Sequence, residues 1–388
     1  MNRVNIPQKK INALISFGTR PEGIKLAPVI KCASKQRDKF NLKICSTGQH
    51  KEMVKQVIDF FDIKPDFSLN LMTENQSLSY FSSRLLSKVD KIIVDAKPDI
   101  VLIQGDTTSA LLIALSAFYR KIKVGHVEAG LRTYDRNSPF PEEINRQLIS
   151  RVADFHFAPT ISSFNNLLAE RVNKDSVFLT GNTVVDAVNW AIEKIKKIGV
   201  KKIESGEPFN LLNSRDKVIL VTMHRRESFG SDIENVCRAL KVIAEKYNDI
   251  KIVYPVHFNP NVREPVFKIL SGIDNILLAE PLNYQSFIWL MNKSYFIITD
   301  SGGVQEEAPV LKKPVLVIRE KTERTESVDL GISKLVGMDA DSIVESVSNL
   351  LDNKLIYEKM IPGANPYGDG NAAEKIIECI YKSLNNKR

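Results

Sequence analysis

Short apolar runs alternate along the whole chain with longer segments whose apolar residues recur at helical spacing. A short apolar run bounded by turn residues is typical of a buried strand, and the longer segments are typical of amphipathic helices. Strands that alternate with helices predict a parallel sheet with crossover helices, and therefore an α/β fold. The predicted strands are residues 11–17, 42–46, 100–104, 123–127, 155–158, 177–180, 218–222, 251–256, 275–278, 295–299 and 314–318. The predicted helices include residues 20–35, 77–96, 233–246 and 284–291.

The length of the chain predicts two domains. At 388 residues it exceeds the size at which a single hydrophobic core stops growing. After a segment with helical spacing at 184–198, residues 194–208 become rich in Lys, Gly and Glu, as in a solvated linker. The α/β pattern resumes at residue 218, so we place the junction of the two halves within 181–216.

Composition limits the partners to be expected. Hydrophobic residues make up 43% of the chain, and the net charge of +8 comes from 54 basic and 46 acidic residues spread along it. This excess of basic residues suits an anionic small substrate, but a genome that favours lysine codons would produce it equally well. No block of Lys and Arg with interleaved aromatic residues occurs, so no nucleic-acid partner is expected.

Cysteine usage and hydropathy predict a soluble, cytoplasmic protein. The cysteines form no Cys-x-x-Cys pair and are interpreted as free buried thiols of a reducing compartment. They are Cys32, Cys45, Cys237 and Cys379. No run of about 18 apolar residues occurs, so no membrane partner is expected.

The stretch from residue 122 to residue 146 combines a strand, an irregular loop and a helix start. The loop leaves the carboxyl end of strand 123–127 and carries Glu128, Arg132 and Asp135, at the strand end where open α/β sheets bind ligands. Pro141 is predicted as the first helical residue. Glu142 and Glu143, which follow it, either belong to a site or only complement the helix dipole.

Polar residues follow predicted strands in both halves of the chain. This bias predicts one cleft between two facing domains. In the first half these residues are Arg20, Gln49, His50, Asp106 and Glu128, and in the second half they are His224, Arg225, Arg226, Glu227, His257 and Asp300 to Gly303.

Ser301-Gly302-Gly303 follows an apolar strand and opens a predicted helix. Free backbone N–H groups at such a turn suit a diphosphate, and Arg20 and Arg225 would add charge-assisted contacts. The alternative is an ordinary glycine turn with a serine cap. Glu307 is better suited to ribose hydroxyls than to a phosphate.

Asp106, Glu128 and Glu142 form a carboxylate cluster if their loops converge. Clustered carboxylates raise one another's pKa, which suits acid–base catalysis near neutral pH. A metal site is disfavoured because the histidines are not at ligand spacing, and His156 is expected in a strand core. Asp106 could also belong to a plain helix cap. Neither a Walker lysine loop nor Gly-x-Gly-x-x-Gly occurs, so no ATP or NAD cofactor is expected.

Taken together, these motifs resemble the non-hydrolysing UDP-N-acetylglucosamine 2-epimerases over essentially the whole chain. The motifs are Gly18-Thr19-Arg20-Pro21-Glu22, Gly48-Gln49-His50, Gly105-Asp106-Thr107-Thr108, His126-Val127-Glu128-Ala129-Gly130-Leu131-Arg132, Pro141-Glu142-Glu143-Ile144-Asn145-Arg146, Gly181-Asn182-Thr183-Val184-Val185-Asp186, His224-Arg225-Arg226-Glu227, Tyr254-Pro255-Val256-His257, Thr299-Asp300-Ser301-Gly302-Gly303-Val304-Gln305-Glu306-Glu307 and Asn365-Pro366-Tyr367-Gly368-Asp369-Gly370.

The resemblance implies two Rossmann-like domains that face each other across a cleft, as in GT-B glycosyltransferases. Residues 1–182 would form the first domain, joined by a C-terminal helix at about 371–388, and residues 183–370 would form the second, UDP-binding domain. The implied activity interconverts UDP-GlcNAc and UDP-ManNAc without NAD or metal, for surface polysaccharide synthesis. UDP would leave to give a 2-acetamidoglucal and then add back. The resemblance also implies a homodimer.

The resemblance assigns roles to individual residues. The implied catalytic residues are Asp106, Glu128, Glu142 and His224. The implied substrate-binding residues are Arg20, Lys25, Arg146, His257, Phe287 near the uracil, Ser301, Gly302, Gly303, Glu307 and Arg324. Residues of an allosteric site would be Gln49, His50 and Arg225.

The chain departs from the family pattern at a few positions. Thr325-Glu326-Ser327 replaces a usual Pro-Glu-Ala, and Gly331-Ile332 replaces Gly-Thr. Glu52 and Asn75 stand where activated members have Gln and Arg, which predicts an altered or absent activator site. The competing functions are an epimerase of a related UDP-2-acetamido sugar, a GT-B glycosyltransferase, a hydrolysing epimerase and a catalytically silent UDP-sugar sensor.

Overall fold

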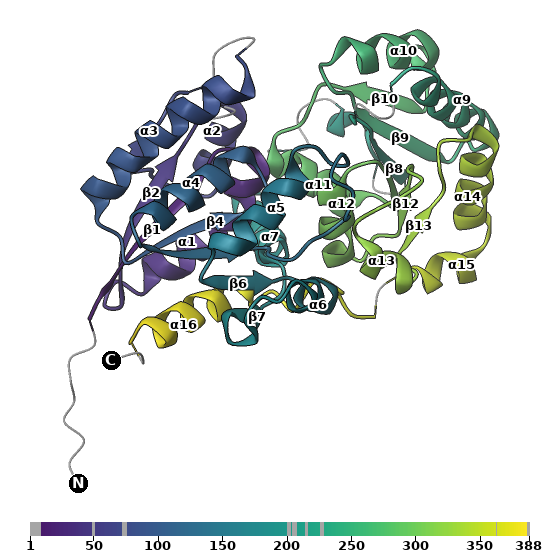
Figure 1. Cartoon of the computed structure of the whole chain (residues 1–388). Helices are drawn as coiled ribbons and strands as arrows, with labels where there is room; N and C mark the ends of the chain where they lie inside the picture. Colours follow the sequence, from purple (N-terminus) through teal and green to yellow (C-terminus); the bar gives the residue numbers. More distant parts are fainter. Residues whose placement is uncertain are drawn as a thin grey trace. The chain divides into compact units, whose positions relative to one another are not determined.

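The computed structural model describes residues 9–48, 51–71, 76–199, 203, 208–213, 216–225, 229–361 and 363–385. The chain divides into two compact units (Figure 1). The first is Met1–Ala187 with Tyr367–Arg388, and the second is Val188–Pro366. Each unit is built on a parallel sheet with helices on its faces, which confirms the predicted α/β fold of two Rossmann-like domains.

In the described part of the first unit, seven strands pair in the order β3-β2-β1-β4-β5-β6-β7, all parallel. The strands are β1 (Ile11–Phe17), β2 (Phe40–Ser46), β3 (Phe67–Ser68), β4 (Ile100–Gln104), β5 (Lys123–Val127), β6 (Phe155–Ala158) and β7 (Val177–Leu179). The helices are α1 (Arg20–Lys35), α2 (Lys51–Phe60), α3 (Leu78–Ala96), α4 (Thr108–Tyr119), α5 (Glu142–Val152), α6 (Ile161–Ala169), the 3-10 turn η1 (Lys174–Ser176) and α16 (Ala372–Asn385). Helix α7 (Thr183–Ile198) begins in the first unit and ends in the second.

Helices cover both faces of this sheet. Successive side chains of a strand point to opposite faces, so Leu14 and Phe17 of β1 lie on different sides. On one side Leu14 belongs to an apolar cluster with Leu85 of α3. On the other side Phe17 approaches α1 and α2: a Cβ atom at Gly23 would lie 3.4 Å from the Phe17 ring and 3.2 Å from Val57. The absence of a side chain at Gly23 therefore lets α1 lie close to β1 and α2.

In the described residues of the second unit, six strands pair in the order β10-β9-β8-β11-β12-β13, also parallel. The strands are β8 (Lys217–Thr222), β9 (Ile250–Pro255), β10 (Ile276–Ala279), β11 (Phe296–Thr299), β12 (Val315–Val317) and β13 (Ser333–Leu335). The helices are α9 (Ser231–Lys246), α10 (Pro260–Leu270), α11 (Tyr284–Lys293), α12 (Gly302–Glu307), α13 (Thr325–Asp329), α14 (Ala340–Asp352) and α15 (Lys354–Lys359), with the 3-10 turns η2 (Phe209–Leu211) and η4 (Ala308–Leu311). Helices α9, α10 and α14 share one apolar core with alternate residues of β8, β9 and β11.

Each sheet has one point at which the order of its strands reverses. In the first unit β1 lies between β2 and β4, and in the second unit β8 lies between β9 and β11. Loops that leave the carboxyl ends of β1 and β4, or of β8 and β11, run in opposite directions from such a point. In open α/β sheets this is where ligands bind.

The predicted strands at 100–104, 123–127 and 155–158 occur at those residues. The prediction missed β3 and β13, which have two and three residues and are too short to show a periodic pattern. It was also wrong about Pro141, which precedes α5 as its N-cap residue with φ −91° and ψ 10°. No helix in the described ranges is long and apolar enough to cross a lipid bilayer.

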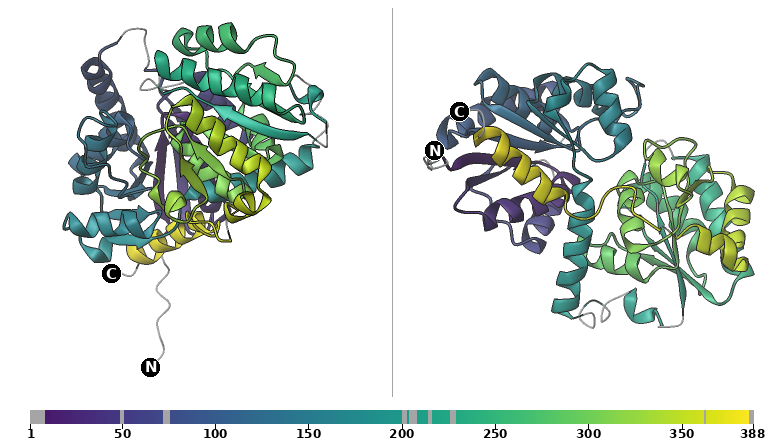
Figure 2. Two further views of the ribbon diagram at one scale, coloured as in Figure 1. Left: turned by 90° about the vertical axis from the view of Figure 1, so that its right-hand side faces the viewer. Right: turned by 90° about the horizontal axis from the view of Figure 1, so that it is seen from below.

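Helix α16 returns to the first unit and packs beside α1. In Figure 2 it is the yellow helix that lies against the purple, amino-terminal part of the chain. Its start is fixed by Asp186 of α7, whose carboxylate accepts hydrogen bonds from the N–H groups of Ala372 and Ala373 at 3.3 and 2.9 Å. Burial raises the pKa of Asp186 even though both backbone bonds lower it. A second link joins Asn182 N–H to the Tyr367 carbonyl at 2.7 Å.

Replacing Asp186 by Ala should loosen α16. The two N–H groups at its start would lose their acceptor, a loss worth about 1 kcal/mol for a helix cap, or roughly fivefold in local opening. Hydrogen exchange of α16 amides, read by mass spectrometry, should therefore speed up by about that factor. Glu378→Ala, which removes an exposed acid paired with Lys382 on the same helix, is the matched control. Equal protection of α16 in both variants would contradict the capping role.

Candidate active site

At the switch point of the first unit, Glu22 joins the loop after β1 to the loop after β4. Its Oε2 atom accepts hydrogen bonds from the N–H groups of Gly18 and Thr19, both at 2.7 Å. Its Oε1 atom accepts a hydrogen bond from the Thr107 hydroxyl at 2.5 Å. The carboxyl group is buried, and this burial raises the pKa of Glu22 although each of these bonds lowers it.

Sequence reasoning gave Glu22 no role of its own. The Thr19-x-x-Glu22 spacing is that of a capping box, and the structure contains that box. The spacing could have revealed the cap. It could not have revealed the bond to Thr107, which lies 85 residues further along the chain.

Asp106 is held by α5. The guanidinium group of Arg146 contacts Asp106 Oδ2 through Nε at 2.8 Å and through Nη2 at 2.7 Å, and it contacts Glu143 through Nη1 at 3.2 Å. Asn145 donates a hydrogen bond to the Asp106 carbonyl at 2.8 Å. The structure thus places Arg146, a predicted substrate ligand, against a predicted catalytic acid.

Glu128 follows the neighbouring strand and is paired with a buried cation. Its Oε2 atom forms an ion pair with Lys25 Nζ and accepts a hydrogen bond from Gln104 at 3.0 Å. The Lys25 and Glu128 side chains are only 8% and 6% exposed. Two charges this deeply buried are tolerated because they neutralise each other.

The backbone at Glu128 is itself unusual. Its φ of 66° lies in the left-handed region, which non-glycine residues seldom adopt. Two residues later Gly130 has φ 91°, and a Cβ atom there would lie 2.1 Å from the Ser163 carbonyl oxygen. The chain can therefore turn sharply after β5 only with glycine at position 130.

The three acids of the expected carboxylate cluster follow β4, follow β5 and begin α5. Asp106 and Glu128 do follow adjacent strands, but each forms an ion pair with a basic residue, Arg146 or Lys25. Glu142 is the half-buried first residue of α5. Two of the three predicted acids, Asp106 and Glu128, are thus each paired with a cation.

Glu143 and Arg132 hold the loop between β5 and α5. Glu143 is fully buried and accepts hydrogen bonds from the N–H groups of Thr133 and Tyr134 at 3.0 and 3.3 Å. Burial opposes its ionisation, but hydrogen bonds from Thr133 and Gln147 and the charge of Arg146 lower the pKa of Glu143. Arg132 is paired with Glu170 at 2.6 Å. These contacts give Glu143 a structural role that goes beyond the helix dipole.

Two histidines of the first unit are buried in its sheet. His126 Nε2 donates to the Gly105 carbonyl at 2.7 Å, and burial lowers its pKa to about 3. His156 Nε2 donates to the Ser150 carbonyl at 3.1 Å, and burial lowers its pKa too. Both rings are therefore neutral, and the expected strand-core position of His156 is confirmed.

At the switch point of the second unit, Asp300 joins the loops after β8 and β11. It is fully buried, and its Oδ2 atom accepts hydrogen bonds from the N–H groups of His224 and Arg225, both at 2.8 Å. The His224 ring stacks on the His257 ring with centroids 6.0 Å apart. Burial and the neighbouring His224 lower the pKa of His257. The structure thus brings together two predicted site histidines from different loops.

A network of arginines lies next to this point. Glu323 contacts Arg319 at 3.0 Å and Arg225 at 3.6 Å, and it forms a closer ion pair with Arg324. Burial opposes ionisation of Glu323, but the three arginines hold its pKa far below the usual range. Arg324 also contacts Glu306 at 2.9 Å.

Ser301-Gly302-Gly303 begins α12, as expected. Ser301 is the N-cap residue of α12, but its side chain makes no cap hydrogen bond. A Cβ atom at Gly302 would lie 2.9 Å from Arg324 Cζ, so the guanidinium group packs against the bare backbone there. Glu307 is buried at the end of α12, and Phe287 is half-buried on α11.

Three comparisons with known proteins give the same family. A family model described as UDP-N-acetylglucosamine 2-epimerase matches residues 32–381. The UDP-N-acetylglucosamine 2-epimerase of Campylobacter jejuni is 52% identical over 383 residues, which cover 98% of this chain and 99% of the relative. The structure of the Neisseria meningitidis enzyme bound to UDP-GlcNAc has a TM-score of 0.90 and 48% identity over 95% of this chain and 99% of that one. The Methanocaldococcus jannaschii enzyme in complex with UDP-GlcNAc and UDP has a TM-score of 0.79 and 34% identity over 95% and 99%.

The chain belongs to the UDP-N-acetylglucosamine 2-epimerase family. The family resemblance drawn from the motifs is thereby confirmed, and members of this family are isomerases.

Some predicted features of this epimerase family member lie outside the described residues. These are Gln49 and His50 of the allosteric prediction, Asn75, Arg226 and Glu227, and the side chain of Glu52. Of the positions that depart from the family pattern, Thr325 is exposed at the start of α13. Ser327 is buried and donates to the Arg324 carbonyl at 3.2 Å.

The described residues contain no group of three or more His, Cys, Asp or Glu side chains that could hold a metal ion.

All four cysteines are free. Cys45 and Cys237 are buried as predicted, and burial raises their pKa values to about 11 and about 12. Cys32 and Cys379 are only half-buried.

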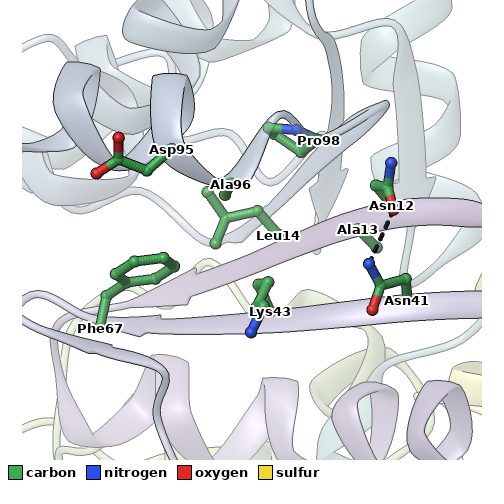
Figure 3. A pocket seen from close by; sticks show the side chains of 9 residues that line it. All are labelled: Asn12, Ala13, Leu14, Asn41, Lys43, Phe67, Asp95, Ala96 and Pro98. Carbon is green, nitrogen blue, oxygen red and sulfur yellow. Dashed lines mark hydrogen bonds between the residues drawn. The ribbon is translucent and has the colours of Figure 1, made fainter.

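A cavity of about 400 Å³ in the first unit lies at the end of the sheet opposite to the candidate site residues (Figure 3). It is lined near the amino-terminal ends of β1 and β2 by Asn12 and Asn41, which share a hydrogen bond of 3.0 Å, and by the end of α3. Because the candidate residues follow the carboxyl ends of the strands, this cavity is not the candidate site.

The raised pKa of Glu22 predicts a specific pH dependence of stability. Between about pH 4.5 and the raised value, the folded protein binds more protons than the unfolded chain, so the free energy of unfolding falls as pH rises. Glu22→Gln removes this titration. The stability advantage of wild type over Glu22→Gln should therefore shrink as pH rises from about 4.5 to about 7. Urea unfolding at several pH values, with Glu374→Gln as the exposed control, measures it. An advantage that grows with pH would contradict the assignment.

Proposed function

We propose that the chain is a non-hydrolysing UDP-GlcNAc 2-epimerase, which interconverts UDP-GlcNAc and UDP-ManNAc. The observation that carries the proposal is family membership, with 48% identity to a relative whose structure holds UDP-GlcNAc. The positions of the motif residues after β1, β4, β5, β8, β9 and β11 support it, because these are the strand ends at which α/β sheets bind nucleotides.

In this proposal the substrate is a UDP-sugar. Arg20 and the backbone N–H groups of Gly302 and Gly303 bind the diphosphate, with Arg324 supplying charge beside them. Lys25, Arg146, His257 and Ser301 complete the polar contacts. Glu307 accepts hydrogen bonds from ribose hydroxyls, and Phe287 packs on the uracil.

The proposed chemistry uses Asp106, Glu128, Glu142 and His224. A base removes the proton from C2 of the sugar, the electron pair forms the C1–C2 double bond, and the C1–O bond to UDP breaks. Addition of UDP to C1 and of a proton to the other face of C2 reverses these changes. The C2 proton is weakly acidic, so the cations and backbone donors that stabilise departing UDP lower the barrier together with the base.

The ion pairs of the first unit support this assignment. Lys25 contacts Glu128 and Arg146 contacts Asp106, so each carboxylate is held in a fixed position after its strand, β5 or β4. A base must be correctly positioned before it can remove a proton, and these contacts supply that positioning.

We extend the proposal to the setting of the protein. Four free thiols suit a reducing compartment, so we propose a cytoplasmic location. We also propose a homodimer, a role in surface polysaccharide synthesis, and domains of residues 1–182 with 371–388 and of residues 183–370.

Loss of either paired acid should slow turnover more than it weakens binding. Asp106→Asn and Glu128→Gln should each lower kcat by about 10²-fold or more, the usual worth of acid–base catalysis, with UDP affinity nearly unchanged. Asp99→Asn is the matched control, because Asp99 also pairs with a lysine and accepts a backbone N–H, but before β4 instead of after it. Near-normal kcat in an acid variant would remove that residue from the chemistry.

The reaction route predicts the fate of the C2 hydrogen. With UDP-GlcNAc as substrate in D₂O, product UDP-ManNAc should carry deuterium at C2, because the proton that leaves and the proton that arrives use groups in exchange with solvent. NMR of the product measures this. Retention of the original hydrogen during turnover would overturn the elimination route. Transfer of the sugar to an acceptor would indicate a glycosyltransferase, and free ManNAc a hydrolysing epimerase.

A further inference from the structure

Asp300 has one carboxylate oxygen whose bonding is incomplete. Its Oδ2 atom accepts two backbone hydrogen bonds, but its buried Oδ1 atom accepts none from the described residues. Buried carboxylate oxygens nearly always accept hydrogen bonds, so an unfilled one calls for a physical explanation. The nearest explanation is the ring of His224, whose Nδ1 atom lies 3.3 Å from Oδ1.

The geometry fits a bond that is not yet fully formed. At 3.3 Å the two atoms are within reach of a charge interaction but are not aligned as a hydrogen bond. The His224 backbone is already fixed by Asp300 Oδ2, so a rotation of the ring about its own side-chain bonds can bring Nδ1 into line with Oδ1.

The neighbouring histidine has the opposite hydrogen-bonding arrangement. His257 Nδ1 accepts a hydrogen bond from the Asn259 N–H at 3.1 Å, so the proton of the neutral His257 ring is on Nε2. An ionised carboxylate can only accept, so Asp300 requires the proton of His224 on Nδ1. The two stacked rings would then present different atoms, a donor Nε2–H on His257 and a lone pair on Nε2 of His224.

We propose that Asp300 is a positioning residue that holds His224 as the Nδ1–H tautomer, with the Nε2 lone pair directed to the sugar nucleotide. The proposal deepens the proposed function and rests on it for the role of His224. In that role, Nε2 takes up the proton released from C2 of the sugar, the Asp300 carboxylate stabilises the imidazolium formed, and the proton then leaves to solvent. The same division of labour orients the histidine of serine protease triads.

The tautomers can be read directly by NMR, with or without activity. In ¹⁵N-histidine-labelled protein, His126, His156 and His257 should show a protonated Nε2, because each donates from Nε2 or accepts at Nδ1. His224, assigned by the signal missing in His224→Gln, should show the reverse, a protonated Nδ1. A wild-type His224 with its proton on Nε2 would overturn the proposal without any variant of Asp300.

Asp300→Asn tests the cause. Its amide oxygen can still accept the two backbone hydrogen bonds, but its NH₂ group would face Nδ1 and favour a bare Nδ1. We expect the His224 tautomer to reverse, and kcat to fall by about 10²-fold or more with little change in KM. A wild-type tautomer in Asp300→Asn would show that Asp300 only fixes the backbone, and would overturn the proposal.

A matched control separates charge loss from general damage. Asp339 caps α14 in the same unit by accepting the Ser342 N–H at 2.9 Å, so Asp339→Asn makes the same chemical change away from any histidine. It should leave the His224 tautomer and kcat as in wild type. If wild-type protein does not epimerise UDP-GlcNAc, the proposed function falls, while the tautomers still decide the link between Asp300 and His224.

Discussion

In each unit, one buried carboxylate joins the two loops that meet where the strand order reverses. Glu22 binds the loops after β1 and β4, and Asp300 binds the loops after β8 and β11. Each acid satisfies at least two backbone N–H groups, and an unmade buried hydrogen bond costs about 1–3 kcal/mol. The loops that carry Arg20, Asp106 and His224 are therefore fixed relative to their own sheets before any ligand binds.

Several candidate site residues are buried charged groups, and ion pairs make their burial possible. Lys25 neutralises Glu128, Arg146 neutralises Asp106, and three arginines surround Glu323. Removing one member of a buried pair leaves the other uncompensated, which costs about 3–5 kcal/mol. The same contacts that stabilise the fold thus hold these acids and cations in fixed positions.

The described histidines divide into two classes by environment. His126 and His156 are neutral, buried and bonded to backbone carbonyls inside the first sheet. His224 and His257 follow strand ends in the second unit and stack on each other. His224 is 45% exposed, so it can meet a ligand as the sheet histidines cannot. Among these four histidines, the two that follow strand ends are accessible to a ligand, and the two inside the sheet are not.

The sequence by itself determined the α/β class, most strand positions and the family, because buried parallel strands are continuous apolar runs and the motifs are local. It also indicated which residues follow strands. Only the tertiary structure decided which of them pair. Arg146 next to Asp106, Lys25 next to Glu128, and Thr107 bonded to Glu22 are contacts between residues 40, 103 and 85 positions apart. Sequence spacing carries no information on such pairs. They depend on the order of the strands in the sheet, which places β1 beside β4 although β2 and β3 lie between them in the sequence. The short strands β3 and β13 were missed for a related reason: pairing with a neighbouring strand defines them, and their own two or three residues do not.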